Sequence, residues 1–338
     1  MTVKFLELPD FTLEGGATLR PARLAYQTYG SLAPDRSNAI LYPTAYADTH
    51  VNNEWLIGPG RALDTDRYFV IVPNMFGNGL SSSPSNTPAP YDAAHFPRLS
   101  IRDNVNAQHR LVTGEFGIER LQLVLGWSMG AAQTYQWAVS HPDMVARALP
   151  FCGSPRTSQH NIVFLMGLRA ALTADARFDG GAYERPPVTG LRAFARVYAG
   201  WGFSQAFYWQ ERWRELGFSS LEDFVANWWE ATFLAHDAND LLAMLGAWEH
   251  ADVGVTPGHG GKLESALGSI RARLLAVPAE KDLYFPPEDE QWAGTHIPGG
   301  EVRVIPGVWG HLAGRGANPA DNAFIERAIH DLLADPAA

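Results

Sequence analysis

Short apolar runs along the chain alternate with segments in which apolar residues recur every three to four positions. The runs have the length of strands buried on both faces, and they fall at residues 38–43, 68–73, 121–125, 146–151, 273–278 and 301–306. Residues 101–116 and 319–333 have the spacing of amphipathic helices. Strands that alternate with helices predict an α/β fold with a mostly parallel sheet. Residues 4–12 and 18–30 predict a hairpin of antiparallel edge strands at its start.

The pattern changes between residues 154 and 268. No strand-like run occurs there, whereas helical spacing and aromatic residues are dense. We expect a helical lid inserted into a core formed by residues 1–153 and 269–338. The aromatic side chains are expected to build a second small core, and a lid over the carboxyl end of the sheet would turn some of them toward a substrate pocket.

A sharp turn is predicted directly after the run at 121–125. Gly126-Trp127-Ser128-Met129-Gly130 fits G-x-S-x-G, the nucleophile elbow, in which small flanking residues let a strand and a helix nearly touch. The following helix ends at His141-Pro142. An isolated G-x-S-x-G string is also compatible with a plain glycine-rich turn, and the strand before it and the helix after it favour the elbow. We therefore predict Ser128 as a nucleophile.

A serine hydroxyl needs a neutral imidazole to accept its proton and a carboxylate to orient that imidazole. The α/β-hydrolase fold places them in the order nucleophile, acid, histidine, each after a strand. Asp282 and His311 follow the runs at 273–278 and 301–306 and complete this order with Ser128. Glu280 is the alternative acid. The other ten histidines are better explained as surface or structural residues.

The loop after the first buried strand, residues 44–50, is polar and made of small residues. In this architecture an oxyanion hole takes one N–H from such a loop and one from the residue after the nucleophile. Ala45 and Met129 are the predicted donors. Tyr46 and Trp127, their neighbours in the sequence, are candidate substrate-binding residues.

Composition excludes several other classes. The 26 Lys and Arg against 36 Asp and Glu give a formal net charge of −10, which argues against nucleic-acid or anionic-membrane partners. The sequence shows neither a signal peptide nor a run approaching about 18 apolar residues, so we expect a cytoplasmic protein. Cys152 is expected to be a buried structural residue. No metal-ligand spacing, dinucleotide motif or P-loop is present.

Seven collinear segments make the chain resemble the homoserine O-acetyltransferase family of the α/β-hydrolase superfamily: LAYQTYG, SNAILYP, IRDNVNAQHRLV, GWSMGAAQTYQWA, LRAALTADARFDGG, HDANDLL and DLYFPPE. The resemblance implies acyl transfer through a serine acyl-enzyme, acyl-CoA as donor, no bound cofactor, and a homodimer that pairs through the helical insertion. It also implies the roles given above to Ser128, Asp282, His311, Ala45 and Met129, and it makes Arg169 the arginine that faces the substrate carboxylate.

The chain departs from this family at two places. The family's histidine is followed by an aspartate that meets the substrate amino group, whereas Leu312 stands here, and the first loop reads PTAYADTH instead of HALTGDAH. An apolar residue cannot pair with an ammonium group, and an unpaired charge in a closed site is costly. We therefore expect hydrolysis of a small ester or related acyl compound, with O-acyl transfer to homoserine or another hydroxyl as the alternative. A non-catalytic binding protein on this scaffold is a third hypothesis.

Overall fold

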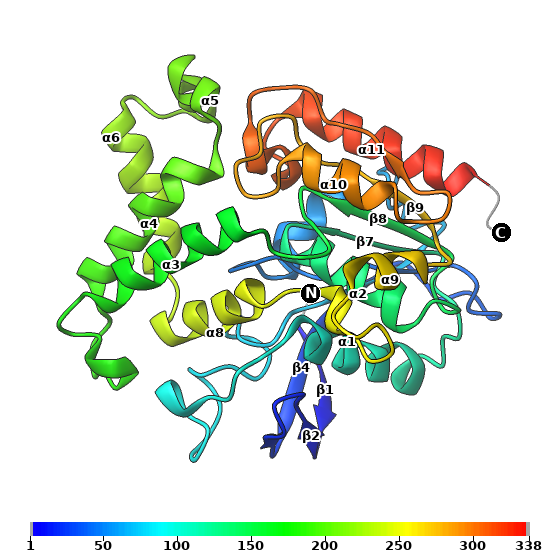
Figure 1. Cartoon of the computed structure of the whole chain (residues 1–338), viewed down its shortest axis with the longest axis horizontal. Coiled ribbons are helices and arrows are strands. Elements are labelled where there is room, and N and C mark those ends of the chain that lie inside the picture. Colours follow the sequence, from blue (N-terminus) through cyan, green and yellow to red (C-terminus); the bar gives the residue numbers. More distant parts are fainter. Residues whose placement is uncertain (1–2, 336–338) are drawn as a thin grey trace.

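A computed structural model describes residues 3–335 as a twisted sheet with helices on both sides (Figure 1). The strands follow the spatial order β1-β4-β6-β5-β7-β8-β9-β10. The pairs β1–β4 and β4–β6 are antiparallel and all the others are parallel, as the sequence pattern predicts. The strand bounds are β1 Lys4–Leu8, β4 Ala22–Tyr29, β5 Ala39–Leu41, β6 Phe69–Pro73, β7 Leu123–Trp127, β8 Arg147–Phe151, β9 Arg273–Ala276 and β10 Glu301–Val302. A small hairpin joins β2 (Phe11–Thr12) to β3 (Thr18–Leu19).

The central strands are buried along their length. Every residue of β5, β6 and β8 is buried, and so are the first four residues of β7. Both faces of these strands are covered, which explains why they read as continuous apolar runs and not as alternating patterns. Parallel pairing brings their carboxyl ends to one edge of the sheet, and the functional loops leave from that edge.

Four helices cover the sheet: α1 (Ile101–Arg110), α2 (Met129–Ser140), α10 (Pro287–Gly294) and α11 (Pro319–Ala334). Figure 1 shows α10 and α11 above β7 and β8, and α1 below these two strands. The side chain of Ser100 caps α1 by accepting a hydrogen bond from the Asp103 N–H, and the Asp103 carboxylate accepts one from the Ser100 N–H. The predicted helix 101–116 ends in a π-helical turn over Leu111–Glu115.

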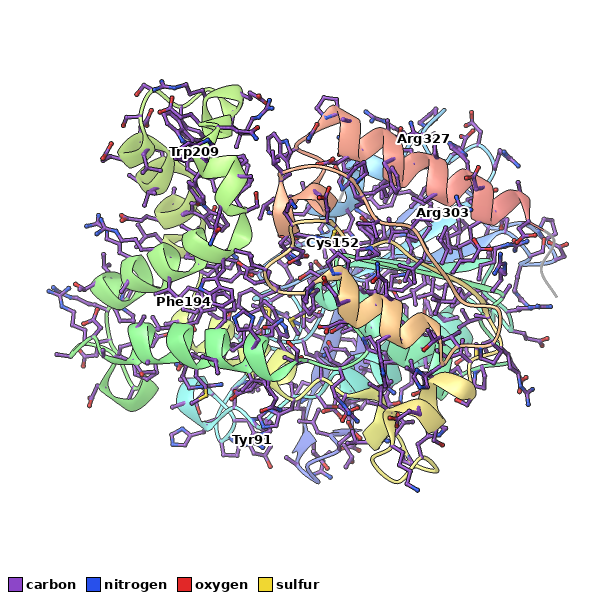
Figure 2. The ribbon with its side chains drawn as sticks, turned by 45° about the horizontal axis from the view of Figure 1, so that its top comes forward. Tyr91, Cys152, Phe194, Trp209, Arg303 and Arg327 are labelled. Atoms are coloured by element: carbon purple, nitrogen blue, oxygen red, sulfur yellow. The ribbon has the colours of Figure 1, made fainter. Side chains whose placement is uncertain are left out.

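Helices also form the segment between β8 and β9. They are α3 (Gln159–Thr173), α4 (Val188–Gly202), α5 (Gln205–Trp209), α6 (Leu221–Phe224), α7 (Ala231–Leu234), α8 (Ala238–Glu249) and α9 (Leu263–Gly268). Most of them lie together beside the sheet (Figure 1). Phe194 points into this group, whereas Trp209, at 89% exposure, lies at its outer end (Figure 2). The buried aromatic side chains contact one another, as in the pairs Phe203–Phe207 and Tyr198–Trp229.

The last strand is shorter than the apolar run 301–306 predicts. Only Glu301 and Val302 form β10, although the N–H of Arg303 still donates to the last residue of β9, and the N–H of Ile305 donates to a carbonyl of the segment after β9. Pro278 lies in that segment and has no N–H to donate in return, so the ladder cannot continue regularly. Beyond this gap the two segments pair again only at an isolated parallel bridge between Ala279 and Ile305.

Candidate active site

Ser128 occupies a strained turn between β7 and α2. Its φ of 58° and ψ of −121° lie in a region that a residue with a side chain rarely adopts. The neighbouring glycines are sterically required: a Cβ on Gly126 would lie 2.3 Å from the Gly130 backbone, and a Cβ on Gly130 would lie 2.8 Å from the Pro43 oxygen. The close approach of strand and helix thus projects the serine above the sheet.

The structure brings the three predicted residues Ser128, Asp282 and His311 together. His311 Nε2 lies 2.9 Å from Ser128 Oγ, and His311 Nδ1 lies 2.8 Å from Asp282 Oδ2. All three side chains are at most 3% exposed. With a proton on Nδ1, the imidazole donates to the carboxylate and leaves Nε2 free to accept the serine proton.

Asp282 and His311 are both held in place by further contacts. Asp282 Oδ1 accepts hydrogen bonds from the N–H groups of Tyr284 and Phe285, at 2.8 and 3.1 Å. The imidazole of His311 stacks on Trp127 with ring centres 5.0 Å apart, and Tyr284 meets it edge-on at 4.5 Å. The indole N–H of Trp127 also donates to the His311 carbonyl oxygen at 3.1 Å. The ring can therefore turn little away from Ser128.

A side chain of α2 links the two segments that carry the predicted oxyanion donors, Ala45 and Met129. The side-chain amide of Gln133, on α2, donates to the carbonyl oxygens of both Thr44 and Met129, at 2.9 and 3.1 Å. Within residues 3–335, the N–H of Ala45 and that of Met129 have no backbone acceptor. Sequence reasoning missed Gln133, because a buried glutamine on a helix carries no motif.

A cavity of about 450 Å³ opens onto His311. Aromatic side chains dominate its walls, and they come from the elbow and from the helical segment: Trp127, Tyr198, Trp228, Trp229 and Phe233. Tyr46, Leu312 and the ion pair between Asp48 and Arg315 also line the cavity. Tyr46 and Trp127 thus lie where the sequence predicts substrate contacts, whereas the Asp48–Arg315 pair was not predicted.

Arg169 does not reach this cavity. Its guanidinium pairs with Glu249 at 2.9 Å and lines a separate cavity of about 670 Å³ between α3, α8 and the loop before α1. The expectation that Arg169 faces the substrate therefore has no support from its position. The helical spacing placed it on α3 correctly, but it could not show which neighbour the side chain meets.

The alternative candidates lie elsewhere. Glu280 is exposed and pairs with Lys281 at 2.9 Å, so Asp282 is the carboxylate that reaches His311. Cys152 is fully buried near the centre of the molecule (Figure 2). Burial raises the pKa of its thiol well above the usual value, and the nearby Asp282 raises it further. A neutral buried thiol is a poor nucleophile.

Residues 3–335 contain neither a helix that could span a membrane nor a cluster of metal ligands. None of the helices in this part of the chain has both the length and the apolar character to cross a membrane. Within residues 3–335, no group of three or more His, Cys, Asp or Glu side chains is arranged to hold a metal ion.

Comparison with known proteins agrees with the fold. The sequence profile of the alpha/beta hydrolase fold matches residues 39–179. The chain is 38% identical to an ethyl acetate hydrolase of Pseudomonas veronii over 99% of this chain and 96% of the relative. It is 35% identical to a homoserine O-acetyltransferase of Thermobifida fusca, over 91% and 88%. The crystal structure of an acetylester hydrolase from Corynebacterium glutamicum superposes with a TM-score of 0.96 at 38% identity, over 99% and 96% of the two chains.

The fold, the buried Ser-His-Asp arrangement and these relatives define an enzyme of the α/β-hydrolase superfamily. Within that superfamily, the chain belongs to the homoserine O-acetyltransferase family, as a divergent member whose relatives include both esterases and acetyltransferases.

Proposed function

We propose that the protein hydrolyses a small carboxylic ester through an acyl-enzyme on Ser128. The observation that carries the proposal is the continuous hydrogen-bonded series from Ser128 through His311 to Asp282, buried beside an apolar cavity. Leu312, which follows the histidine and lines the same cavity, offers no charge for the amino group of homoserine. Relatives that are an ethyl acetate hydrolase and an acetylester hydrolase support acetate esters as the substrate class.

The steps follow from the geometry. Ser128 Oγ attacks the ester carbonyl carbon while His311 Nε2 takes the hydroxyl proton. The N–H groups of Ala45 and Met129 stabilise the oxyanion that forms. Collapse of the tetrahedral intermediate expels the alcohol, which receives the proton from Nε2. Water then attacks the acyl-enzyme with His311 again as base, and the carboxylic acid leaves as Ser128 regains its proton.

Acyl transfer to a hydroxyl acceptor is the second candidate, because a homoserine O-acetyltransferase is also among the relatives. In that reaction acyl-CoA would acylate Ser128, and an alcohol would replace water in the second half. A transferase must exclude water and seat the acceptor. The aromatic cavity could exclude water, but Leu312 is unsuited to an amino-bearing acceptor.

We further propose that the protein forms a homodimer through its helical segment, residues 154–268. Helix α3 supports this proposal because Val163 and Met166 are 64% and 57% exposed and lie three residues apart, on one face of the helix. Exposed apolar side chains that share a helix face favour a protein contact.

Product analysis tests the proposed reaction. Purified protein is given p-nitrophenyl acetate in water and, separately, acetyl-CoA with L-homoserine, and the products are identified by mass spectrometry. Hydrolysis of the ester with a transient acetyl group on Ser128 supports the esterase. Accumulation of O-acetylhomoserine in excess over acetate would instead establish the transferase.

The Ser128→Ala variant is the control for both reactions. Removal of a triad nucleophile lowers turnover by several powers of ten. Esterase activity that survives this substitution, with no labelling of wild-type Ser128 by a fluorophosphonate, would refute catalysis through this serine. If the wild type itself shows neither reaction and Ser128 is not labelled, the non-catalytic binding protein remains as the interpretation of the scaffold.

A further inference from the structure

His236 lies in the turn between α7 and α8, against the loop that follows β5 (residues 42–49, the β5 loop). Its Nδ1 is 2.8 Å from the Thr232 carbonyl oxygen, and its Nε2 is 2.9 Å from the Ala47 carbonyl oxygen. A backbone carbonyl accepts hydrogen bonds and cannot donate one. Both contacts are therefore hydrogen bonds only when both ring nitrogens carry a proton, which is the imidazolium form.

The charged groups around the ring are compatible with a positive charge. Asp237 and Asp240 lie at the start of α8. Burial raises the pKa of Asp240 to about 6, and the charge of His236 opposes this rise. On the side of the β5 loop, Asp48 and Arg315 form an ion pair with each other, so that side adds no unbalanced charge.

The contact with Ala47 acts on a strained part of the chain. Ala47 has a φ of 57°, in the left-handed region that alanine rarely adopts. It lies two residues after Ala45, whose N–H is the proposed oxyanion donor. The adjacent Tyr46 is also tied to the helical segment, because its hydroxyl donates to the Leu241 carbonyl oxygen at 3.0 Å. The helical segment thus holds the β5 loop at two consecutive residues.

We propose that His236 is a positioning residue: in its doubly protonated form it fixes the Ala47 carbonyl and thereby aims the Ala45 N–H at the reacting carbonyl. This inference rests on the proposed function, since it concerns how the oxyanion is stabilised. His236 contacts neither Ser128 nor His311, and it acts only through the backbone of the β5 loop.

The direction of the pH effect follows from the hydrogen-bond roles. When the His236 ring carries only one proton, one ring nitrogen becomes an acceptor that faces a carbonyl oxygen. One of the two hydrogen bonds from His236 is then lost, and kcat is expected to fall. His311 has the opposite requirement, because it must be neutral to accept the serine proton. The ratio of wild-type to variant kcat cancels the contribution of His311.

Two substitutions at position 236 separate positioning from packing. His236→Phe keeps an aromatic ring and removes both donors. His236→Gln supplies an amide N–H that can reach the Ala47 carbonyl and does not titrate. His250→Phe is the matched control, because His250 Nδ1 makes the same contact to the carbonyl four residues earlier, at 2.9 Å, and makes no contact with the β5 loop.

The experiment measures kcat and KM for p-nitrophenyl acetate between about pH 5.5 and 9, which spans histidine titration. Loss of one oxyanion donor costs roughly 10²–10³ in kcat, and a misplaced donor should cost less. We expect wild-type kcat to exceed that of His236→Phe by about 10-fold while the His236 ring carries both protons, and we expect this ratio to fall as pH rises. KM should change by less than about twofold, because the lost interaction acts in the transition state.

His236→Gln is expected to restore most of the activity near pH 6, and His250→Phe is expected to match the wild type throughout. Two-bond ¹H–¹⁵N spectra of the histidine-labelled protein report the protonation of each ring nitrogen. Among the rings that are protonated on both nitrogens near pH 6, one should be absent from the spectrum of His236→Phe. A kcat ratio that does not change with pH, or a His236 ring with one bare nitrogen near pH 6, would overturn the inference.

The failure of the proposed function would look different. If the wild type shows no hydrolysis that depends on Ser128, the reaction is wrong, and the spectra still test the double protonation of His236. If the wild type is active and His236→Phe has an unchanged kcat, only the positioning role is wrong.

Discussion

Among the described residues, Glu290 is the buried carboxyl group whose pKa lies furthest from its usual value. It is 1% exposed, and the Tyr135 hydroxyl donates to its Oε2. Burial raises its pKa to about 8 from a usual value of 4.5, and the bond from Tyr135 opposes only part of that rise. The folded protein therefore keeps Glu290 protonated at neutral pH, where the unfolded chain would have lost the proton.

This displacement predicts how stability depends on pH. Between about pH 4.5 and 8 the folded state binds more protons at this site than the unfolded state. The contribution of Glu290 to the free energy of unfolding is thus fully present below this window. As pH rises through the window, this contribution falls by up to roughly 1.4 kcal/mol per pH unit. Glu290→Gln removes the titration. Urea unfolding at several pH values should show the wild type losing stability relative to the variant across the window.

Glu119→Gln provides the control, since it makes the same substitution at an exposed site. Its stability difference from the wild type should stay level across the same pH values. If the stability difference between the wild type and Glu290→Gln also stayed constant with pH, the Glu290 carboxyl group would be ionised in the folded protein.

At this scale the sequence allowed part of the site to be predicted. Ser128, Asp282 and His311 each follow a strand, so the strand pattern and the fold's chain order brought them together. Gln133, His236 and Arg315 act through contacts to segments distant in the sequence, and no periodicity or motif marks such contacts. Arg169 shows the converse, because its helix was predicted but its partner Glu249 was not.

At the scale of elements, one ion pair joins the two loops that carry the site. Asp48 lies in the β5 loop, and Arg315 ends the 3-10 helix Gly310–Arg315 that begins one residue before His311. Arg315 Nη1 lies 2.5 and 2.6 Å from the two Asp48 oxygens, and the guanidinium lies 5.3 Å from the centre of the Trp127 ring. Asp48 is only 4% exposed on its side chain, compared with 25% for Arg315.

The burial of Asp48 predicts that the two residues are energetically coupled. Arg315→Met leaves a buried carboxylate unpaired, and we expect it to lower the free energy of unfolding by about 2 kcal/mol, less than for a fully buried pair because Arg315 is partly exposed. The double variant with Asp48→Asn should lose less than the sum of the single losses. A double-mutant cycle measured by urea unfolding gives the coupling.

The Arg303–Asp331 pair serves for comparison, because its side chains are 40% and 59% exposed at a distance of 2.6 Å. Its coupling should stay below about 1 kcal/mol. Equal coupling in the two pairs would show that the Asp48–Arg315 contact is no more than a surface interaction.

The helices and strands that depend on the pattern of apolar residues were predicted best. The buried strands and the helices α1, α2 and α11 follow from it, whereas the π-helical turn at Leu111–Glu115 and the two-residue strand β10 do not. Those two depend on local hydrogen bonds, which the pattern of apolar residues does not encode.

For the whole molecule, the proposed homodimer is open to a direct test. Replacing Val163 and Met166 together by glutamate places two charges on the exposed face of α3, and burying them between two copies would be costly. We expect this variant to elute as a monomer in size-exclusion chromatography with light scattering, under conditions in which the wild type is dimeric. Phe5→Glu, at a 42% exposed position on β1, should leave the dimer intact.

A variant that stays dimeric after both substitutions on α3 would exclude this helix from the interface. The division of the chain into a core and a lid at residues 154 and 268 also remains a prediction. The sheet order and the helices between β8 and β9 are consistent with it, but the extent to which either part folds alone is a separate property.

The hydrogen bond from Tyr46 to the Leu241 carbonyl has a consequence for protein engineering and for divergence within the family. Exchanging residues 154–268 between relatives is an obvious way to alter substrate preference, since this segment supplies most of the aromatic walls. The segment also supports the β5 loop, which is encoded more than a hundred residues earlier and carries the proposed oxyanion donor. A chimera that takes the segment without a matching residue 46 would therefore inherit the new pocket and a loosened β5 loop. Substrate range and catalytic competence would then have to change together.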